Sequence, residues 1–136
     1  MIVIDSNVLF SALIKDSTTR RLIIEHEEPF LFPEYVFVEF ERHKDLLVRK
    51  SKLSRASFDA LVSILVSGVT IVPHEAIEPY LPYAHRIIDA IDPDDAIFIA
   101  CVLAHPGSVL WSDDARLKQQ NEVEVISTSE LLAQQD

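Results

Sequence analysis

The feature that most constrains the fold is a series of five short, largely apolar runs, separated by longer segments with helical features. The runs span residues 2–4, 30–32, 69–72, 109–111 and 123–126. Short apolar runs rich in β-branched and aromatic residues are typical of strands covered on both faces in a parallel sheet. Strands that alternate with helices predict a parallel sheet with helices on both of its faces. We therefore expect a three-layer α/β/α fold.

The segments between these runs predict the helices. These span residues 7–15, 18–26, about 33–50, 54–67, 84–90, 94–105, 115–120 and 128–134. Asp16 or Ser17 is a candidate cap for the second helix, and Pro33 suits the first turn of the third. Three prolines within residues 73–82 predict an irregular segment there.

Size and composition predict one globular domain spanning residues 1–136. Hydrophobic residues make up 49% of the chain, which is enough for a sizeable core. The longest apolar run, residues 96–104, is less than half as long as a membrane-spanning helix. The apolar N-terminal stretch lacks the basic leading region of a signal peptide, so we expect a cytoplasmic protein with no membrane contact. Cys101 lies within the apolar run and is expected to be buried, outside any disulfide.

Several common binding motifs are absent from the sequence. The chain has two glycines, whereas phosphate-binding loops need several. Its five scattered histidines and one cysteine lack the spacing of zinc ligands. The net charge of −10 disfavours nucleic acid binding by the surface as a whole. The distribution of the acids is therefore more informative than their number.

Acidic residues gather at four places, two of which are the ends of predicted strands. Asp5 follows the first strand directly, and Asp113 and Asp114 follow the fourth after one serine. The other acids of interest are Asp92, Asp94 and Asp95 before the most apolar helix, and Glu39 and Glu41 beside an apolar stripe of Val36, Phe40 and Leu47. Ligands of parallel α/β sheets bind beyond the carboxyl ends of the strands. Carboxylates that converge there repel one another unless a cation such as Mg²⁺ or Mn²⁺ neutralises them.

A carboxylate site of this kind suits phosphodiester hydrolysis, because bound metal ions generate hydroxide and stabilise the leaving oxygen. Each acid also has an ordinary structural interpretation. Asp92 can cap a helix, and Asp94 and Asp95 can complement the helix dipole. Ser112 or Asp113 can cap the next helix. Glutamates such as those near residue 40 are usually solvated.

Half of the basic residues lie in one segment that begins soon after Glu39. Six of the twelve lysines and arginines are Arg42, Lys44, Arg49, Lys50, Lys52 and Arg55. Asp45 is the only acid within that segment. The segment can hold a phosphate backbone beside the acids. The alternative is a solvated pair of helices with cations near a helix C-terminus.

Four sequence blocks resemble motifs of the PIN-domain ribonucleases, in particular the VapC-like toxins of toxin–antitoxin pairs. The blocks are Ile2-Val3-Ile4-Asp5-Ser6-Asn7-Val8-Leu9, Pro33-Glu34-Tyr35 leading to Glu39-Phe40, Asp92-Pro93-Asp94-Asp95-Ala96 leading to Ile99-Ala100, and Trp111-Ser112-Asp113-Asp114. They occur in the family's order, and the resemblance covers essentially the whole chain. Any one block is a weak signal, but four together are specific.

The resemblance implies that the metal-binding, catalytic acids are Asp5, Glu39, Asp95 and Asp114. Asp95 is favoured over Asp94 because the family's acid directly precedes the small residue that Ala96 matches. Asp114 is favoured over Asp113, which falls where the family often has asparagine, yet Asp113 stays a candidate metal ligand. Positions that usually support the acids through hydrogen bonds are matched by Ser6, Asn7 and Ser112.

The resemblance also implies a fold and an activity. The fold is a five-stranded parallel sheet of order 3-2-1-4-5. The activity is cleavage of single-stranded RNA by a Mg²⁺- or Mn²⁺-dependent endoribonuclease with metal-activated water as the nucleophile, in a toxin that an antitoxin neutralises. We also expect a homodimer.

Two alternative functions remain open. One is a phosphatase or phosphotransferase with Asp5 as the nucleophile. Haloacid-dehalogenase-type sites carry a second aspartate two residues later, where this chain has Asn7, which counts against that alternative. The other is a non-catalytic RNA- or protein-binding module that uses the basic segment.

Overall fold

The computed structural model describes residues 1–14 and 17–135, and its central feature is a five-stranded parallel sheet. The strands are β1 (Ile2–Ile4), β2 (Phe30–Pro33), β3 (Val69–Val72), β4 (Val109–Trp111) and β5 (Val125–Ile126). Their order is β3-β2-β1-β4-β5, and all neighbouring strands are parallel. The expected fold class and strand order are therefore confirmed.

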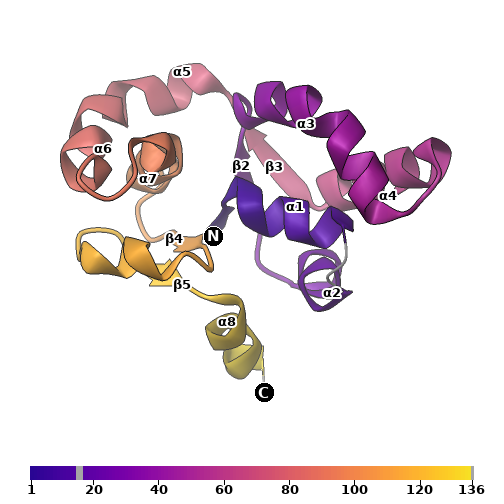
Figure 1. Cartoon of the computed structure of the whole chain (residues 1–136). Coiled ribbons are helices and arrows are strands. Elements are labelled where there is room, and N and C mark those ends of the chain that lie inside the picture. Colours follow the sequence, from indigo (N-terminus) through magenta and orange to yellow (C-terminus); the bar gives the residue numbers. More distant parts are fainter. Residues whose placement is uncertain (15–16, 136) are drawn as a thin grey trace.

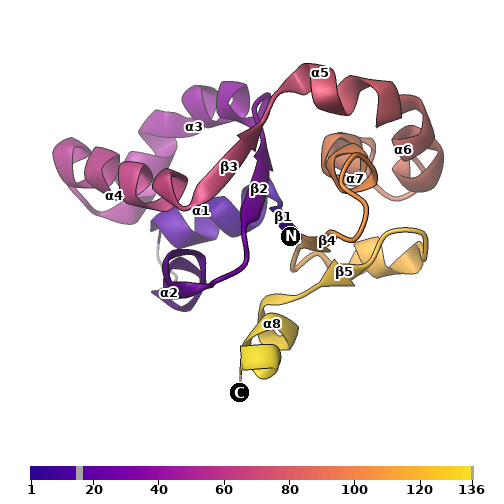
Figure 2. The same ribbon diagram turned by 180° about the vertical axis from the view of Figure 1, so that it is seen from behind.

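Helices surround this sheet. The α-helices are α1 (Ser6–Ile14), α2 (Ser17–Glu25), α3 (Val36–Ser51), α4 (Arg55–Ser67), α5 (His74–Ile77), α6 (Leu81–Ile88), α7 (Ala96–Leu103) and α8 (Thr128–Gln135). The 3₁₀ helices are η1 (Glu78–Tyr80), η2 (Pro93–Asp95) and η3 (Ala115–Gln119). Figures 1 and 2 show α7 on one side of the strands, and α1, α3 and α4 on the other. No helix in the described ranges combines the length and the apolar character needed to cross a membrane.

The core lies on both faces of the central strands. Every residue of β1 is buried, and so is Trp111 at the end of β4. On the sheet's flanks, α3 buries Val36, Phe40 and Leu47, which confirms the predicted apolar stripe. The mostly buried helix α7 contains Cys101, which is fully buried, as expected, with a free thiol. Burial raises the pKa of that thiol to about 12, which makes it a small hydrophobic residue of the core.

Prolines account for two corrections to the expected elements. Pro33 is the last residue of β2 and not part of a helix, and α3 begins only at Val36. Proline has no N–H to donate to a ladder, so it suits the end of a strand better than its interior. Residues 73–82, expected to be irregular, form α5, η1 and the start of α6. Pro79 and Pro82 occupy first-turn positions of η1 and α6, where a helix needs no N–H.

The last strand is shorter than expected because of one glutamine. β5 covers only residues 125–126 of the predicted strand 123–126. The Gln120 side chain donates to the Val123 carbonyl at 2.8 Å and accepts from the Val123 N–H at 2.9 Å. Both backbone groups of Val123 are therefore paired with a side chain instead of a neighbouring strand.

Other helix boundaries are set by caps. Asp92 caps η2 by accepting from the Asp94 N–H at 3.0 Å, so its expected capping role is confirmed, and α7 starts at Ala96 instead of residue 94. The cap of η3 is Asp114, and the expectation of Ser112 or Asp113 was wrong. Ser54 caps α4 and Gly68 ends it. The expected helix residue Lys15 and the candidate cap Asp16 lie outside the described residues.

Candidate metal centre

The topology of the sheet brings two acid-bearing strand ends side by side. β1 and β4 are neighbouring, parallel strands. Asp5 follows β1 directly, and its N–H donates to the Trp111 carbonyl at 3.2 Å. Asp113 and Asp114 follow β4 after Ser112. These side chains therefore start from the carboxyl edge of the sheet, where parallel α/β proteins bind their ligands.

Asp5 is the buried acid of this edge, with 4% of its surface exposed. Its Oδ1 accepts from the N–H of Val8 at 2.8 Å, in the first turn of α1. The Ser112 hydroxyl donates a second hydrogen bond to it. Burial raises the pKa of Asp5 to about 6, helped by repulsion from the acids after β4 and opposed by the two hydrogen bonds. Burial and two hydrogen bonds thus hold this carboxyl in place.

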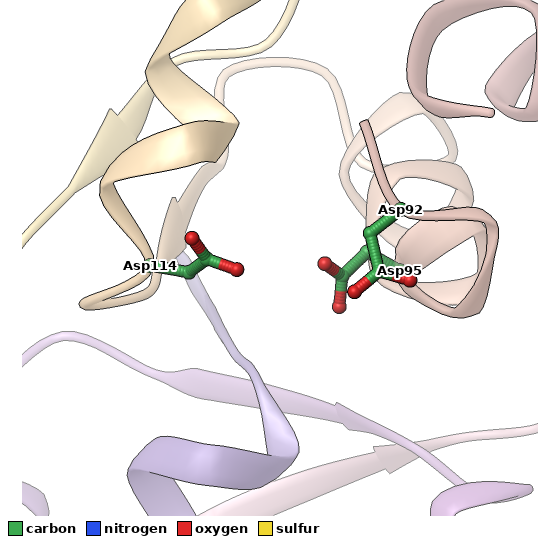
Figure 3. A group of neighbouring side chains, drawn as sticks. All are labelled: Asp92, Asp95 and Asp114. Atoms are coloured by element: carbon green, nitrogen blue, oxygen red, sulfur yellow. The ribbon is translucent and has the colours of Figure 1, made fainter. Parts of the chain in front are cut away.

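Three further carboxylates form what we call the acid cluster: Asp92, Asp95 and Asp114. One oxygen of each lies within 4.8 Å of those of the other two. In Figure 3, Asp114, which caps the start of η3, faces Asp92 and Asp95 across a gap. Burial, followed by repulsion from Asp92, Asp5 and Asp114, raises the pKa of Asp95 to about 7. Asp5 is therefore close enough to act electrostatically on the acid cluster.

The donor set of the acid cluster fits a hard divalent cation. Carboxylate oxygens are the ligands that Mg²⁺ and Mn²⁺ prefer. Oxygens around one Mg²⁺ at about 2.1 Å lie at most about 4.2 Å apart, so side-chain adjustments suffice to close the acid cluster around an ion. The half-buried Asp95 carboxyl accepts no hydrogen bond from any described residue, so no protein donor competes with a cation for its oxygens.

Ser112 connects the buried acid to the acid cluster. Its hydroxyl donates to Asp5, and the same oxygen accepts from the N–H of Asp114 at 3.2 Å. Ser6 begins α1 directly after Asp5. Asn7 lines a hollow of about 280 Å³ together with Asp113 and Asp114. The residues expected to support the acids therefore all lie at this edge of the sheet.

Asp113 is engaged elsewhere. Its Oδ1 accepts from the Thr128 N–H and its Oδ2 from the Thr128 hydroxyl, both at 2.7 Å. Trp111 Nε1 donates to the same hydroxyl oxygen at 2.9 Å. Both oxygens of Asp113 thus fix the start of α8, whereas Asp114 faces Asp92 and Asp95. Of these two neighbouring acids, the geometry favours Asp114 as a metal ligand.

The structure does not bring Glu39 into the acid cluster. Glu39 is half-buried in the first turn of α3, and no hydrogen bond or ion pair joins it to another described residue. Glu41 is exposed and lines a different hollow, between α3 and α4, with Lys44 and Asp59. Of the two glutamates, neither contacts an acid that follows a strand.

The basic segment divides into paired and unpaired cations. Lys44 pairs with Asp59 at 3.1 Å, and Arg55 pairs with Asp45 at 2.6 Å. Within the described chain, no ion pair involves the remaining cations of the segment, which are Arg42, Arg49, Lys50 and Lys52. Lys50 lines a hollow of about 440 Å³ between α1 and α3. Asn7 also lines this hollow, which therefore adjoins the hollow beside Asp114.

Two residues of the site were not among the ligands and supporting residues predicted from the sequence. Asp92 belongs to the acid cluster although its capping role explains it fully, and its spacing of three from Asp95 was the available signal. Arg116 pairs with Asp114 at 2.7 Å and with Asp92 at 3.3 Å. This guanidinium holds the pKa of Asp114 below its ordinary value. No periodicity or motif in the sequence singles out Arg116.

The raised pKa values predict that the metal-free protein loses stability as the pH rises from about 4 to about 7. In the folded protein, Asp5 keeps its proton up to about pH 6 and Asp95 up to about pH 7. In the unfolded chain, aspartate releases its proton near pH 3.8. In this window the folded state binds more protons, so the free energy of unfolding falls with increasing pH. For Asp5, whose pKa is raised from 3.8 to about 6, the expected loss over the whole window is about 3 kcal/mol. Urea titrations in EDTA at pH 4 and pH 8 measure most of it, and Asp5→Asn should reduce the difference. Equal stability at both pH values in the parent would contradict the expectation.

Comparison with known proteins agrees with this geometry. A family model described as PIN domain matches residues 3–134, which is nearly the whole chain. A search of curated proteins found no match. PIN domains are generally nucleases and typically use divalent metal ions, which agrees with carboxylates gathered at the edge of the sheet. The chain therefore belongs to the PIN-domain family.

Proposed function

We propose that this chain is an endoribonuclease that requires Mg²⁺ or Mn²⁺ and cleaves single-stranded RNA. The observation that carries the proposal is the convergence of Asp92, Asp95 and Asp114 within 4.8 Å, in a chain that belongs to a family of nucleases. Repulsion among these acids is relieved by a cation. The three carboxylates would hold a divalent ion, which would supply activation of water for attack and stabilisation of the leaving oxygen.

The proposed roles of the residues follow from their environments. Asp92, Asp95 and Asp114 would hold the ion. Asp5 would complete the site from its buried position at the end of β1. Ser112 fixes the orientation of Asp5 and the backbone of Asp114. Glu39 stays a proposed ligand on the basis of the family resemblance alone. Asp113 is a weaker candidate because it lies outside the acid cluster and its two oxygens hold the start of α8.

The surroundings of Asp5 disfavour the phosphatase alternative. A nucleophilic aspartate must present a free oxygen to the phosphorus of its substrate. Asp5 is buried and accepts two hydrogen bonds. These properties suit a carboxylate that an ion stabilises better than one that attacks a phosphate.

The test of the proposal is incubation of the purified chain with a panel of single-stranded RNAs in Mn²⁺, Mg²⁺ or EDTA. Cleavage that needs the metal and stops in EDTA is the expected result. Binding of RNA without cleavage in any of the three conditions would favour a non-catalytic binding module instead.

The proposed path of the RNA backbone runs from the acid cluster toward Lys50. The adjoining hollows that share Asn7 connect these two places. Lys50 is exposed at the rim of its hollow and makes no ion pair within the described chain, so its charge is available to a phosphate. Lys44 and Arg55 are less available, because each is paired with an aspartate.

We expect that glutamine at Arg49, Lys50 and Lys52 weakens RNA binding for all sequences without moving the cleavage position. Phosphate contacts position a strand, whereas base contacts choose the site. Binding measured at several salt concentrations should show a shallower salt dependence, with a slope reduced by about 0.7 for each lost phosphate contact. As a matched control, Lys50→Gln is compared with Arg86→Gln. Arg86 is an exposed cation on α6, away from the basic segment. Identical slopes for Lys50→Gln, Arg86→Gln and the parent would rule out Lys50 as a backbone contact.

The resemblance to VapC-like toxins extends the proposal to biological context. We propose that the chain acts as a toxin, that an antitoxin neutralises it, and that it forms a homodimer in the cytoplasm. Expression of the chain should arrest growth of a bacterial host, and Asp5→Asn should not. Growth arrest by both forms would show that toxicity does not arise from cleavage.

A further inference from the structure

The acid cluster already contains a positive charge that belongs to the chain itself. Arg116 Nη2 lies 2.7 Å from Asp114 Oδ2, and Arg116 Nε lies 3.1 Å from Asp114 Oδ1. The same Nη2 lies 3.3 Å from Asp92 Oδ2. One guanidinium therefore engages both oxygens of one acid and reaches a second. Among the described residues, no other cation contacts the acid cluster.

The position of Arg116 is fixed by the backbone. Its N–H donates to Asp114 Oδ1 at 3.0 Å, at the start of η3. The side chain thus begins two residues after a proposed ligand and stays within reach of the acid cluster. It is also exposed to solvent, so it can leave the acids without breaking any packing. A tethered, exposed cation of this kind competes for the acids and does not block them permanently.

We propose that Arg116 is an internal counter-ion that competes with the divalent metal for Asp114 and Asp92, so that metal binding requires its guanidinium to move away. The inference rests on the proposed metal-dependent function. A paired arrangement of two N–H donors on one carboxylate is the strongest form of this contact. A divalent ion bound to the same oxygens would lie close to the guanidinium, and two cations at that separation repel. Asp95, which Arg116 does not contact, is left as the ligand that an arriving ion meets first.

The competition sets the metal affinity of the site. The parental chain should bind Mn²⁺ more weakly than a chain in which the acids are free of Arg116. Lysine at this position should have an intermediate effect, because an ammonium group cannot engage two oxygens of a carboxylate as a guanidinium does. Glutamine keeps much of the side-chain length and removes the charge.

The test is the dissociation constant for Mn²⁺, measured from the electron paramagnetic resonance signal of free Mn²⁺ in the absence of RNA. We expect Arg116→Gln to lower this constant about tenfold, a difference equivalent to about 1.4 kcal/mol. We expect Arg116→Lys to lie between Arg116→Gln and the parent. The matched control is Lys118→Gln, which removes the same charge from η3 but from a residue paired with Glu130. The control should bind Mn²⁺ like the parent.

Two results would overturn the inference. Unchanged or weaker Mn²⁺ binding by both Arg116 variants would show that the guanidinium does not compete. Equal tightening by Lys118→Gln would show that net charge, and not position, sets the affinity. A parent that binds no Mn²⁺ would instead contradict the proposed function itself, so the two failures are distinguishable.

Discussion

Replacing Asp5 with asparagine is expected to abolish metal-dependent RNA cleavage while leaving the protein folded and as stable as the parent or more so. Loss of a residue that only supports a metal ligand costs about 10–100-fold at metal sites, so we expect a loss of more than about a hundredfold here. The fold should survive because asparagine Oδ1 can still accept from the N–H of Val8, the contact that Asp5 makes at 2.8 Å. Removing one buried carboxyl also reduces the repulsion that raises the pKa of Asp95.

The matched control for this substitution is Asp94→Asn. Asp94 lies directly beside the acid cluster in sequence, yet it is exposed and outside the cluster. The Asp94→Asn variant should cleave RNA at the parental rate with the same metal ion. Cleavage at the parental rate by Asp5→Asn, with the melting temperature also unchanged, would mean that Asp5 has no role in the site.

Adding Mn²⁺ to the metal-free protein is expected to raise its melting temperature by about 10 °C. A ligand that binds only the folded state at a hundred times its dissociation constant adds about 2.7 kcal/mol of stability. For a chain of this size, 1 kcal/mol corresponds to a shift of about 4 °C. The ion also removes the repulsion among Asp92, Asp95 and Asp114, which the metal-free protein relieves through Arg116 and through protons.

The comparison that assigns this stabilisation to the acid cluster uses two asparagine variants. Asp114→Asn should lose most of the Mn²⁺-dependent shift, because Asp114 faces the other two acids. Asp94→Asn should keep it. A shift of the same size in both variants and in the parent would place the stabilising ion elsewhere on this acidic chain, whose net charge is −10.

The sheet and half of the site could be predicted because they depend on local patterns. Short apolar runs mark strands, and a polar residue directly after a buried strand must lie at the carboxyl edge of the sheet. This reasoning places Asp5 and the pair Asp113 and Asp114 at that edge, and β1 and β4 are indeed neighbours. The choice of Asp114 from the pair depends on the family resemblance. The choice of Asp95 over Asp94 depended on the family resemblance, because both residues suit the start of a helix equally well.

The remaining features depend on contacts between distant segments, which local patterns do not encode. Asp92 has a sufficient local explanation as a cap, so its approach to Asp114 could not be inferred. Arg116 pairs with Asp92 across 24 positions of sequence. The role of Asp113 was ambiguous for the same reason, since its partner Thr128 lies 15 positions further along the chain. The prediction that Pro33 starts a helix is wrong because a proline suits a first helical turn and also the point where a strand stops.

The most direct test of the proposed metal centre is one Mn²⁺ titration in which bound Mn²⁺ and the rate of RNA cleavage are measured on the same samples. In the parent, both should rise together and saturate at the same concentration. Asp114→Asn should show neither tight binding nor cleavage. Cleavage that persists in EDTA, or Mn²⁺ binding that saturates in the parent while the RNA stays intact, would contradict a metal-dependent site at the acid cluster.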